Sequence, residues 1–162
     1  MHGKRYCVNR FKRLYPDAQY LPLTTERLPD ALHVAEQWFA EHDDGDVSLQ
    51  GELESIREAV ANWESLGMKG GVLYADGEPA AMIMFSAVSE QCLDVHFEKA
   101  TNKFAADGAF AAVSQCMASS TDLEAYTYVN WEEDMGIDGL RRTKEIYQPA
   151  FKLKKYYGEA LK

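Results

Sequence analysis

The most informative segment of this chain is YTYVNWEEDMGIDGLRRTKEIYQPAFKLKKYY, which spans residues 126–157. Its first residues alternate in the way a strand requires, which places on one face Tyr126, Tyr128 and Asn130. An acidic run at 132–134 follows, at the start of a helical pattern. The helix dipole and the unpaired N–H groups favour negative charge at that end. The segment therefore predicts a strand, an acidic turn and a short helix.

The predicted helix carries a lysine on its apolar side. The residues that recur at helical spacing are Ile137, Leu140, Lys144 and Tyr147. A lysine at such a position either extends to water or meets a partner. Pro149 ends the helix, and residues 150–156 are expected to continue as a basic strand.

Eleven residues of this segment match a family signature at fixed spacing: Asn130, Glu132, Glu133, Asp134, Gly136, Gly139, Leu140, Arg141, Lys144, Tyr147 and Pro149. They resemble the DUF2156 family, the phosphatidylglycerol lysyltransferase C-terminal-like proteins of the GNAT-like fold. The run Glu98-Lys99-Ala100 is similar to the family's Glu-Lys-Ala at the end of a strand. Trp131 departs from the pattern, because the family carries a basic residue there, and an anion contact at this position is therefore not implied.

The resemblance implies an α+β, layered fold of the GNAT-like acyltransferase type, with a mixed, mostly antiparallel sheet flanked by helices. Residues 1–18 are expected to form a basic N-terminal helix or linker, and residues 19–162 a single GNAT-like domain. Proteins of this family carry two such lobes in tandem, and this chain resembles the second. The partner that the resemblance implies is therefore another GNAT-like lobe or a second copy of the chain.

The function implied by the resemblance is acyl or aminoacyl transfer from a small-molecule, acyl or aminoacyl donor to an amine or a lipid hydroxyl. The catalytic candidates are Glu98, Asn130 and Asp134, with Asn130 orienting the acceptor or carbonyl and a carboxylate acting as base. The substrate-binding candidates are Lys99, Glu132, Glu133, Arg141, Lys144 and Tyr147. A purely structural alternative pairs Arg141 with Glu145 and uses Asp134 as a helix cap. The alternative function is a non-catalytic lobe that binds a ligand or packs on a partner lobe.

The loop before the second-last helix bears on the cofactor. In GNAT enzymes that use acetyl-CoA, this loop carries Arg/Gln-x-x-Gly-x-Gly/Ala, whose backbone amides hold pyrophosphate. With Gly108 aligned, this chain has Ala105 and Phe110 at the defining positions. The sequence therefore does not support acetyl-CoA and predicts no other cofactor, although Lys103 remains a candidate for holding a different anion.

Residues 92–99 alternate between apolar and polar side chains. Leu93, Val95 and Phe97 are expected on one face of a strand, and the other face is expected to hold Asp94, His96 and Glu98. Carboxylates can orient a histidine and raise its pKa, so this face could transfer protons. A sheet with one solvated face produces the same pattern, and the sequence leaves both interpretations open.

The other elements follow from periodicity and turn signals. Helices are predicted at 4–15, 30–42, 49–66 and 108–117, and strands at 20–24, 72–75 and 79–88. Asp76-Gly77 predicts a type I′ turn, and Gly67 predicts a helix stop. The segment 101–107 is predicted to be a loop. A chain of 162 residues that is 46 % apolar suits a single core.

Charge is spread unevenly along the chain. Residues 1–16 hold five basic and no acidic residues, whereas 17–136 hold five basic and 23 acidic ones. The acidic centre argues against a broad nucleic-acid surface. The basic helix at 4–15 is predicted either to contact an anion or a membrane surface weakly, or to pack on its own or an upstream domain.

Metal, disulfide and membrane signals are weak. Asp43, Asp44 and Asp46 miss the spacing of a calcium-binding loop, so no metal site is predicted. Cys7, Cys92 and Cys116 are odd in number and scattered, which favours reduced thiols and a cytoplasmic location. No apolar run reaches the roughly 18 residues of a transmembrane segment.

Overall fold

The computed structural model describes residues 2–42, 47–120, 125–156 and 158–159. The acidic loop at 43–46 lies outside the described residues. Within them the sheet has five strands in the order β1-β2-β3-β4-β5. The strands are β1 Gln19–Pro22, β2 Lys69–Ala75, β3 Glu78–Ser89, β4 Cys92–Ala100 and β5 Tyr128–Asn130. Neighbouring strands are antiparallel except for the parallel pair of β4 and β5. The predicted mixed, mostly antiparallel sheet is confirmed.

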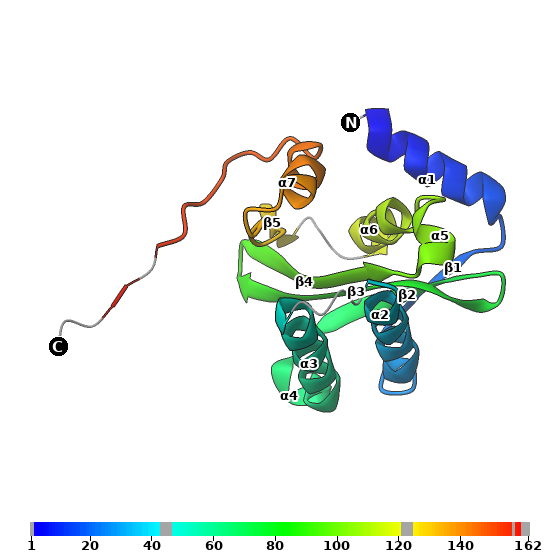
Figure 1. The fold of residues 1–162 in the computed structure, drawn as a ribbon, viewed down its shortest axis with the longest axis horizontal. Coiled ribbons are helices and arrows are strands. Elements are labelled where there is room, and N and C mark those ends of the chain that lie inside the picture. The colour runs from blue at the N-terminus through cyan, green and yellow to red at the C-terminus, as the bar shows by residue number, and fades with distance from the viewer. Residues whose placement is uncertain (1, 43–46, 121–124, 157, 160–162) are drawn as a thin grey trace. The chain divides into compact units, whose positions relative to one another are not determined.

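Helices cover both faces of this sheet (Figure 1). One face carries α1 His2–Leu14, α5 Asn102–Ala105 and α6 Ala109–Ser120. The other carries α2 Leu28–His42, α3 Val47–Ala61 and α4 Trp63–Leu66. A last helix, α7 Asp138–Glu145, follows the sheet in sequence. No helix among the described residues is both long and apolar enough to cross a bilayer.

The core has two parts, one on each face of the sheet. On the α6 face, Ile83 and Leu93 pack with Phe104 and Met117. On the α2 face, Met84 packs with residues of α2, α3 and α4. As expected from its unbroken apolar run, β3 is buried from residue 80 to residue 85. The central strand therefore contributes to both parts of the core.

The observed turns match the predicted ones at two places, and two predicted elements differ from the observed ones. Asp76 and Gly77 have φ angles of 53° and 79°, as the type I′ turn between β2 and β3 requires. Gly67 ends α4 with a φ of 60°. The helix predicted over 49–66 is divided at Asn62 into α3 and α4, and the loop predicted over 101–107 contains the short helix α5.

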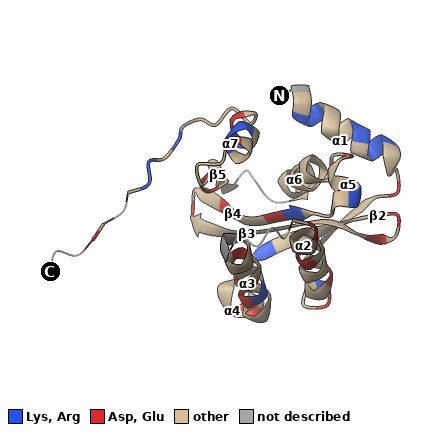
Figure 2. Ribbon diagram, viewed as in Figure 1, with Lys and Arg blue, Asp and Glu red and all other residues tan. Residues whose placement is uncertain are grey.

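The N-terminal helix packs on α6. Its buried residues, Val8 and Phe11, are 7 % and 1 % exposed. Arg10 forms an ion pair with Asp107 at 2.7 Å, while the other basic residues of α1 line its length (Figure 2). A Cβ atom on Gly108 would lie 2.5 Å from the carbonyl oxygen of Cys7, so the two helices approach closely at this glycine. Of the interpretations open for this segment, the structure shows packing on its own domain.

Two compact units divide the chain, His2–Glu132 and Glu133–Lys162. In the second unit, the basic strand predicted over 150–156 is wrong, since the structure describes all seven residues and none is in a strand. Each of them is exposed, and Leu153 and Tyr156 are 80 % and 82 % exposed. Alternating sequence alone does not make a strand when no neighbouring strand accepts its hydrogen bonds.

Candidate functional site

The strand β4 contains a bulge at His96, which determines the face of the sheet on which each later residue of the strand lies. Val95 is the partner of Phe85 and Phe97 is the partner of Met84, which leaves His96 without a partner in β3. Val95 belongs to the core on the α6 face, whereas Phe97 packs on the α2 face. The strict alternation predicted for 92–99 is therefore wrong beyond Val95, because one extra residue reverses the faces.

Glu98 consequently points toward α6 rather than sharing a face with Asp94. The Ser114 hydroxyl donates to its Oε1 atom at 2.5 Å, and the indole N–H of Trp131 donates to Oε2 at 3.2 Å. Burial raises the pKa of the Glu98 carboxyl above its ordinary value, and these two hydrogen bonds and the charge of Lys4 oppose that rise. The carboxyl is thus held in a fixed orientation, with a pKa above that of an exposed glutamate.

Lys99 lies on the opposite face, next to α2 and α3. Its Nζ atom donates to Glu52 at 2.7 Å and lies 4.3 Å from the centre of the Trp38 ring. The residue is only 8 % exposed. Glu98 and Lys99, which stand side by side in the family signature, are therefore separated by the sheet.

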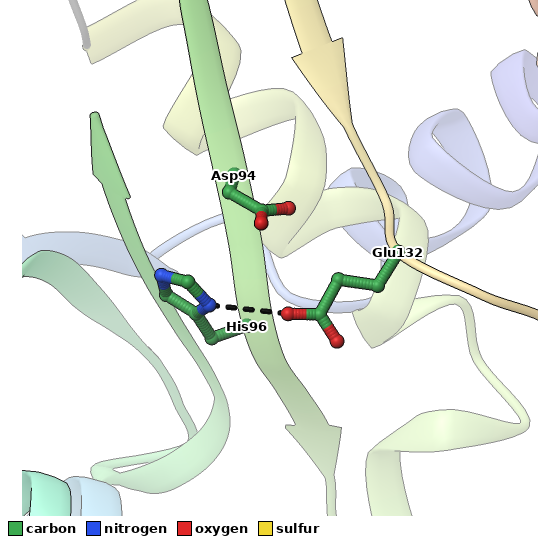
Figure 3. Close-up of side chains that lie close together, drawn as sticks. All are labelled: Asp94, His96 and Glu132. Atoms are coloured by element: carbon green, nitrogen blue, oxygen red, sulfur yellow. Dashed lines mark hydrogen bonds and ion pairs between the residues drawn. The ribbon is translucent and has the colours of Figure 1, made fainter. Parts of the chain in front are cut away.

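Three side chains meet where β4 and β5 run together, and we call them the Asp94–His96–Glu132 cluster (Figure 3). One ligand atom from each residue lies within 4.8 Å of the others. His96 Nδ1 is 3.1 Å from Glu132 Oε1, and because a carboxylate only accepts, Nδ1–H is the donor. His96 Nε2 is 2.8 Å from the hydroxyl of Ser86. Chemically, such a cluster can transfer a proton or bind a divalent cation.

Asn130 connects two members of this cluster. Its Nδ2 donates to Asp94 Oδ1 at 2.9 Å, and its Oδ1 accepts the backbone N–H of Glu132 at 3.2 Å. Glu132 has a φ of 50°, in the left-handed region that non-glycine residues rarely occupy. Both ends of the amide are therefore engaged in holding the two carboxylate residues.

The candidates of the second unit form contacts among themselves. Arg141 Nε pairs with Asp134 at 2.7 Å, so its partner is Asp134 and not Glu145, which pairs with Lys152. Lys144 Nζ donates to the backbone oxygen of Glu133 at 2.5 Å. Ile137 is the N-terminal cap residue of α7, and Asp134 instead accepts the N–H of Gly136 at 2.9 Å.

The Asp134 carboxyl is expected to titrate far below its ordinary range. The hydrogen bond from Arg141 is the largest cause, followed by the Gly136 N–H, and together they lower the pKa from 3.8 to about 2. Because the folded pKa is depressed, this pairing stabilises the unit fully above pH 3.8, and the stabilisation is lost as the pH falls through about 2. Carbon-detected NMR titration should show this midpoint in the unchanged protein.

Two variants test whether Arg141 causes the lowered pKa of Asp134. In Arg141→Gln the Asp134 midpoint should rise toward 3.8, because the main hydrogen bond is lost. In Lys152→Gln it should stay near the original value, while the Glu145 carboxyl, whose pKa Lys152 lowers, should rise. If the titration midpoint of Asp134 is the same in Arg141→Gln as in the unchanged protein, the proposed pairing is wrong.

The structure thus divides the sequence-predicted residues into groups. Glu98, Asn130 and Glu132 lie around the end of the β4–β5 pair, with Glu98 on the other face from the cluster. Glu133, Asp134, Arg141, Lys144 and the partly buried Tyr147 belong to the second unit. The catalytic and binding roles assigned to these residues remain predictions.

Sequence reasoning missed part of the site. It considered His96 for proton transfer without naming Glu132 as its partner, and it overlooked Ser86 and the hydrogen bond from Trp131. The Asp94-x-His96 spacing in a strand was the available signal. The bulge that separates Glu98 from it has no signal in the local sequence.

Comparison with known proteins places this arrangement in a family. The model of the family "Phosphatidylglycerol lysyltransferase, C-terminal" matches residues 1–158. A conserved protein of unknown function from Bacteroides thetaiotaomicron VPI-5482 has a similar structure, with a TM-score of 0.86 and 35 % identity over 92 % of this chain. This chain spans 50 % of the length of the Bacteroides protein. No curated protein matches the chain.

More distant structures share the fold alone. A ribosomal-protein-alanine N-acetyltransferase from Brucella melitensis biovar Abortus 2308 has a TM-score of 0.64 and 10 % identity, covering 88 % of this chain and 99 % of its own. A GCN5-related N-acetyltransferase from Ralstonia eutropha JMP134 has a TM-score of 0.60 and 12 % identity, with coverage of 89 % and 98 %. These neighbours confirm the GNAT-like fold, and by its family match the chain belongs to the phosphatidylglycerol lysyltransferase C-terminal family.

Proposed function

We propose that this domain transfers an activated acyl or aminoacyl group to a hydroxyl or amine, with Glu98 accepting the proton of the attacking nucleophile. Family membership supports this reaction class, because the family is named for a phosphatidylglycerol lysyltransferase. The observation that carries the proposal is the orientation of Glu98. Its two oxygens are fixed by Ser114 and Trp131.

Glu98 lies beside an open strand edge. β5 pairs with β4 only from Cys92 to Asp94, so the rest of β4 has no strand partner on that side among the described residues. The free N–H and C=O groups of such an edge can hold an extended ligand by backbone hydrogen bonds. An acyl donor bound along this edge would bring its carbonyl close to the Glu98 carboxylate.

The proposed step balances without a cofactor. The acceptor oxygen or nitrogen attacks the donor carbonyl carbon as Glu98 takes its proton, and the leaving oxygen or sulfur receives that proton when its bond to carbon breaks. The pKa raised by burial makes the Glu98 carboxylate a stronger base than an exposed glutamate. Asn130, whose amide nitrogen and oxygen each already form a hydrogen bond, would act by positioning Asp94 and Glu132.

The test is a transfer assay with activated lysyl esters and acyl thioesters as donors, and with phosphatidylglycerol micelles or simple amines as acceptors. Glu98→Gln keeps both hydrogen-bond partners and removes the base, so kcat should fall by about 100-fold or more. Glu90→Gln, in the exposed turn before β4, should leave kcat unchanged. Equal rates for Glu98→Gln and the unchanged protein would refute the role of Glu98.

A non-catalytic lobe is the second candidate, and one observation favours it. The chain spans half of the Bacteroides protein, so a partner lobe could contribute the missing part of a site. In that case the unchanged protein would bind a donor, as seen by calorimetry, and yet transfer no group to any acceptor.

A further inference from the structure

We propose that the Asp94–His96–Glu132 cluster binds a divalent transition-metal ion, with zinc as the preferred ion. The three residues supply one imidazole nitrogen and two carboxylates, and one ligand atom from each lies within 4.8 Å of the others. Figure 3 shows the three side chains converging from β4 and from the segment that follows β5. This site is separate from the proposed transfer role of Glu98, which lies on the other face of the sheet.

The spacing is close to what zinc requires. Two ligands at the usual zinc distances and a tetrahedral angle are about 3.4 Å apart. His96 Nδ1 and Glu132 Oε1 are already 3.1 Å apart. The widest separation in the cluster, up to 4.8 Å, must contract by up to about 1.4 Å, which rotation of a carboxylate side chain provides.

The ligands are held by a second layer of hydrogen bonds. Ser86 lies 2.8 Å from His96 Nε2, the ring nitrogen that does not face Glu132. A hydroxyl can donate or accept, so Ser86 fits the tautomer with Nδ1–H and also the metal-bound tautomer with Nε2–H. Asn130 holds the Asp94 carboxylate and the backbone of Glu132 at once. Such partners orient metal ligands and strengthen binding.

Backbone geometry explains why the three ligands meet. Asp94 and Asn130 are partners in the parallel pair of β4 and β5. Glu132, two positions after Asn130, therefore lies near His96, two positions after Asp94. The bulge at His96 and the left-handed φ of Glu132 bring both side chains toward Asp94. Unusual backbone conformations of this kind are often retained at functional sites.

The donor set selects the class of ion. A neutral imidazole with two carboxylates carries two negative charges, which a divalent cation neutralises. Imidazole nitrogen favours zinc and similar ions, whereas calcium and magnesium prefer all-oxygen sites. Three protein ligands leave a position open for water or a ligand oxygen, as in catalytic zinc sites. The side chains of His96 and Glu132 are 26 % and 46 % exposed, so an ion can enter from solvent.

Zinc would take the place of a proton. In the metal-free chain, Nδ1–H of His96 donates to Glu132, and zinc at Nδ1 requires that proton to move to Nε2, facing Ser86. The same contacts therefore serve both states. Binding should shift the ring signals of His96 in NMR spectra without moving those of the exposed His33 of α2.

The experiment is titration of the full chain, freed of metals with a chelator, with zinc chloride in a calorimeter at neutral pH. The unchanged protein should bind one zinc ion per chain at this site. His96→Gln should weaken binding by more than about 100-fold, and Asn130→Ala by roughly 10- to 100-fold. His33→Gln, which replaces an exposed histidine of α2, should have no effect. Cobalt substitution should give a visible spectrum that His96→Gln abolishes.

Two results would overturn the proposal. One is the absence of zinc binding to the unchanged protein. The other is zinc binding that survives both His96→Gln and Glu132→Gln, especially if it is lost in Cys92→Ser. Tryptophan fluorescence confirms that each variant is folded, and Glu132 is exposed enough to be replaced without loss of the core. Glu98→Gln should bind zinc normally, so the transfer proposal and the metal proposal can fail separately.

Discussion

Replacing Gly108 by alanine is expected to lower the free energy of unfolding by about 3 kcal/mol or more. The new Cβ would lie 2.5 Å from the carbonyl oxygen and 2.9 Å from the carbonyl carbon of Cys7. Both are backbone atoms of α1, so relief requires the helix itself to move. The φ of 106° at Gly108 adds strain, because residues with a side chain rarely adopt it.

Gly77→Ala is the matched control for this change. Gly77 also has a positive φ, at 79°, but an added Cβ would meet no atom within 4 Å. Its cost should therefore be only the backbone strain, about 1 kcal/mol. Urea unfolding, monitored by tryptophan fluorescence, measures the free energy of unfolding of both variants, since all three tryptophans lie within His2–Glu132. Equal costs for the two variants would show that the contact with α1 contributes nothing.

Phe11→Ala should destabilise the same unit by about 3–5 kcal/mol. Phe11 is 1 % exposed and belongs to the core on the α6 face, where its ring lies 4.9 Å from that of Tyr15. Removing the ring leaves a cavity that the surrounding side chains cannot fill completely. The measurement is again urea unfolding.

Leu14→Ala provides the comparison within the same helix. Leu14 is 46 % exposed, so its replacement should change the free energy of unfolding by no more than about 0.5 kcal/mol. If α1 were only a linker that rests on the surface, Phe11→Ala would cost as little as Leu14→Ala. The contrast between the two variants therefore tests whether this helix is part of the core.

Much of the fold could be predicted because local signals and tertiary structure agree. Asp76-Gly77 requires the positive φ angles that a type I′ turn provides, and the unbroken apolar run of β3 requires cover on both faces. The signature residues at 130–149 identified the family, which the family match confirms. In these places a short segment contains all the information that its structure needs.

The site could be predicted only in part, because its geometry depends on contacts between distant segments. Helical spacing offers Glu145 as a structural partner of Arg141, but Arg141 pairs with Asp134 from the turn before the helix. His96 meets Glu132, which is 36 positions away in sequence, and no periodicity reports such a contact. The face assigned to Glu98 was reversed by a single extra residue in β4.

That extra residue limits how this segment can change during evolution. Deleting His96 would remove the bulge and leave Val95 opposite Phe85 and Phe97 opposite Met84, so Glu98 and Lys99 would keep their present surroundings. A slip of one residue in the pairing beyond the bulge would instead exchange them. A carboxylate would then stand where Trp38 now meets an ammonium, and an ammonium would stand opposite the indole N–H of Trp131. Homologues that keep both surroundings should therefore either keep this extra residue or lack that residue alone, with other insertions and deletions confined to the turns at either end of β4.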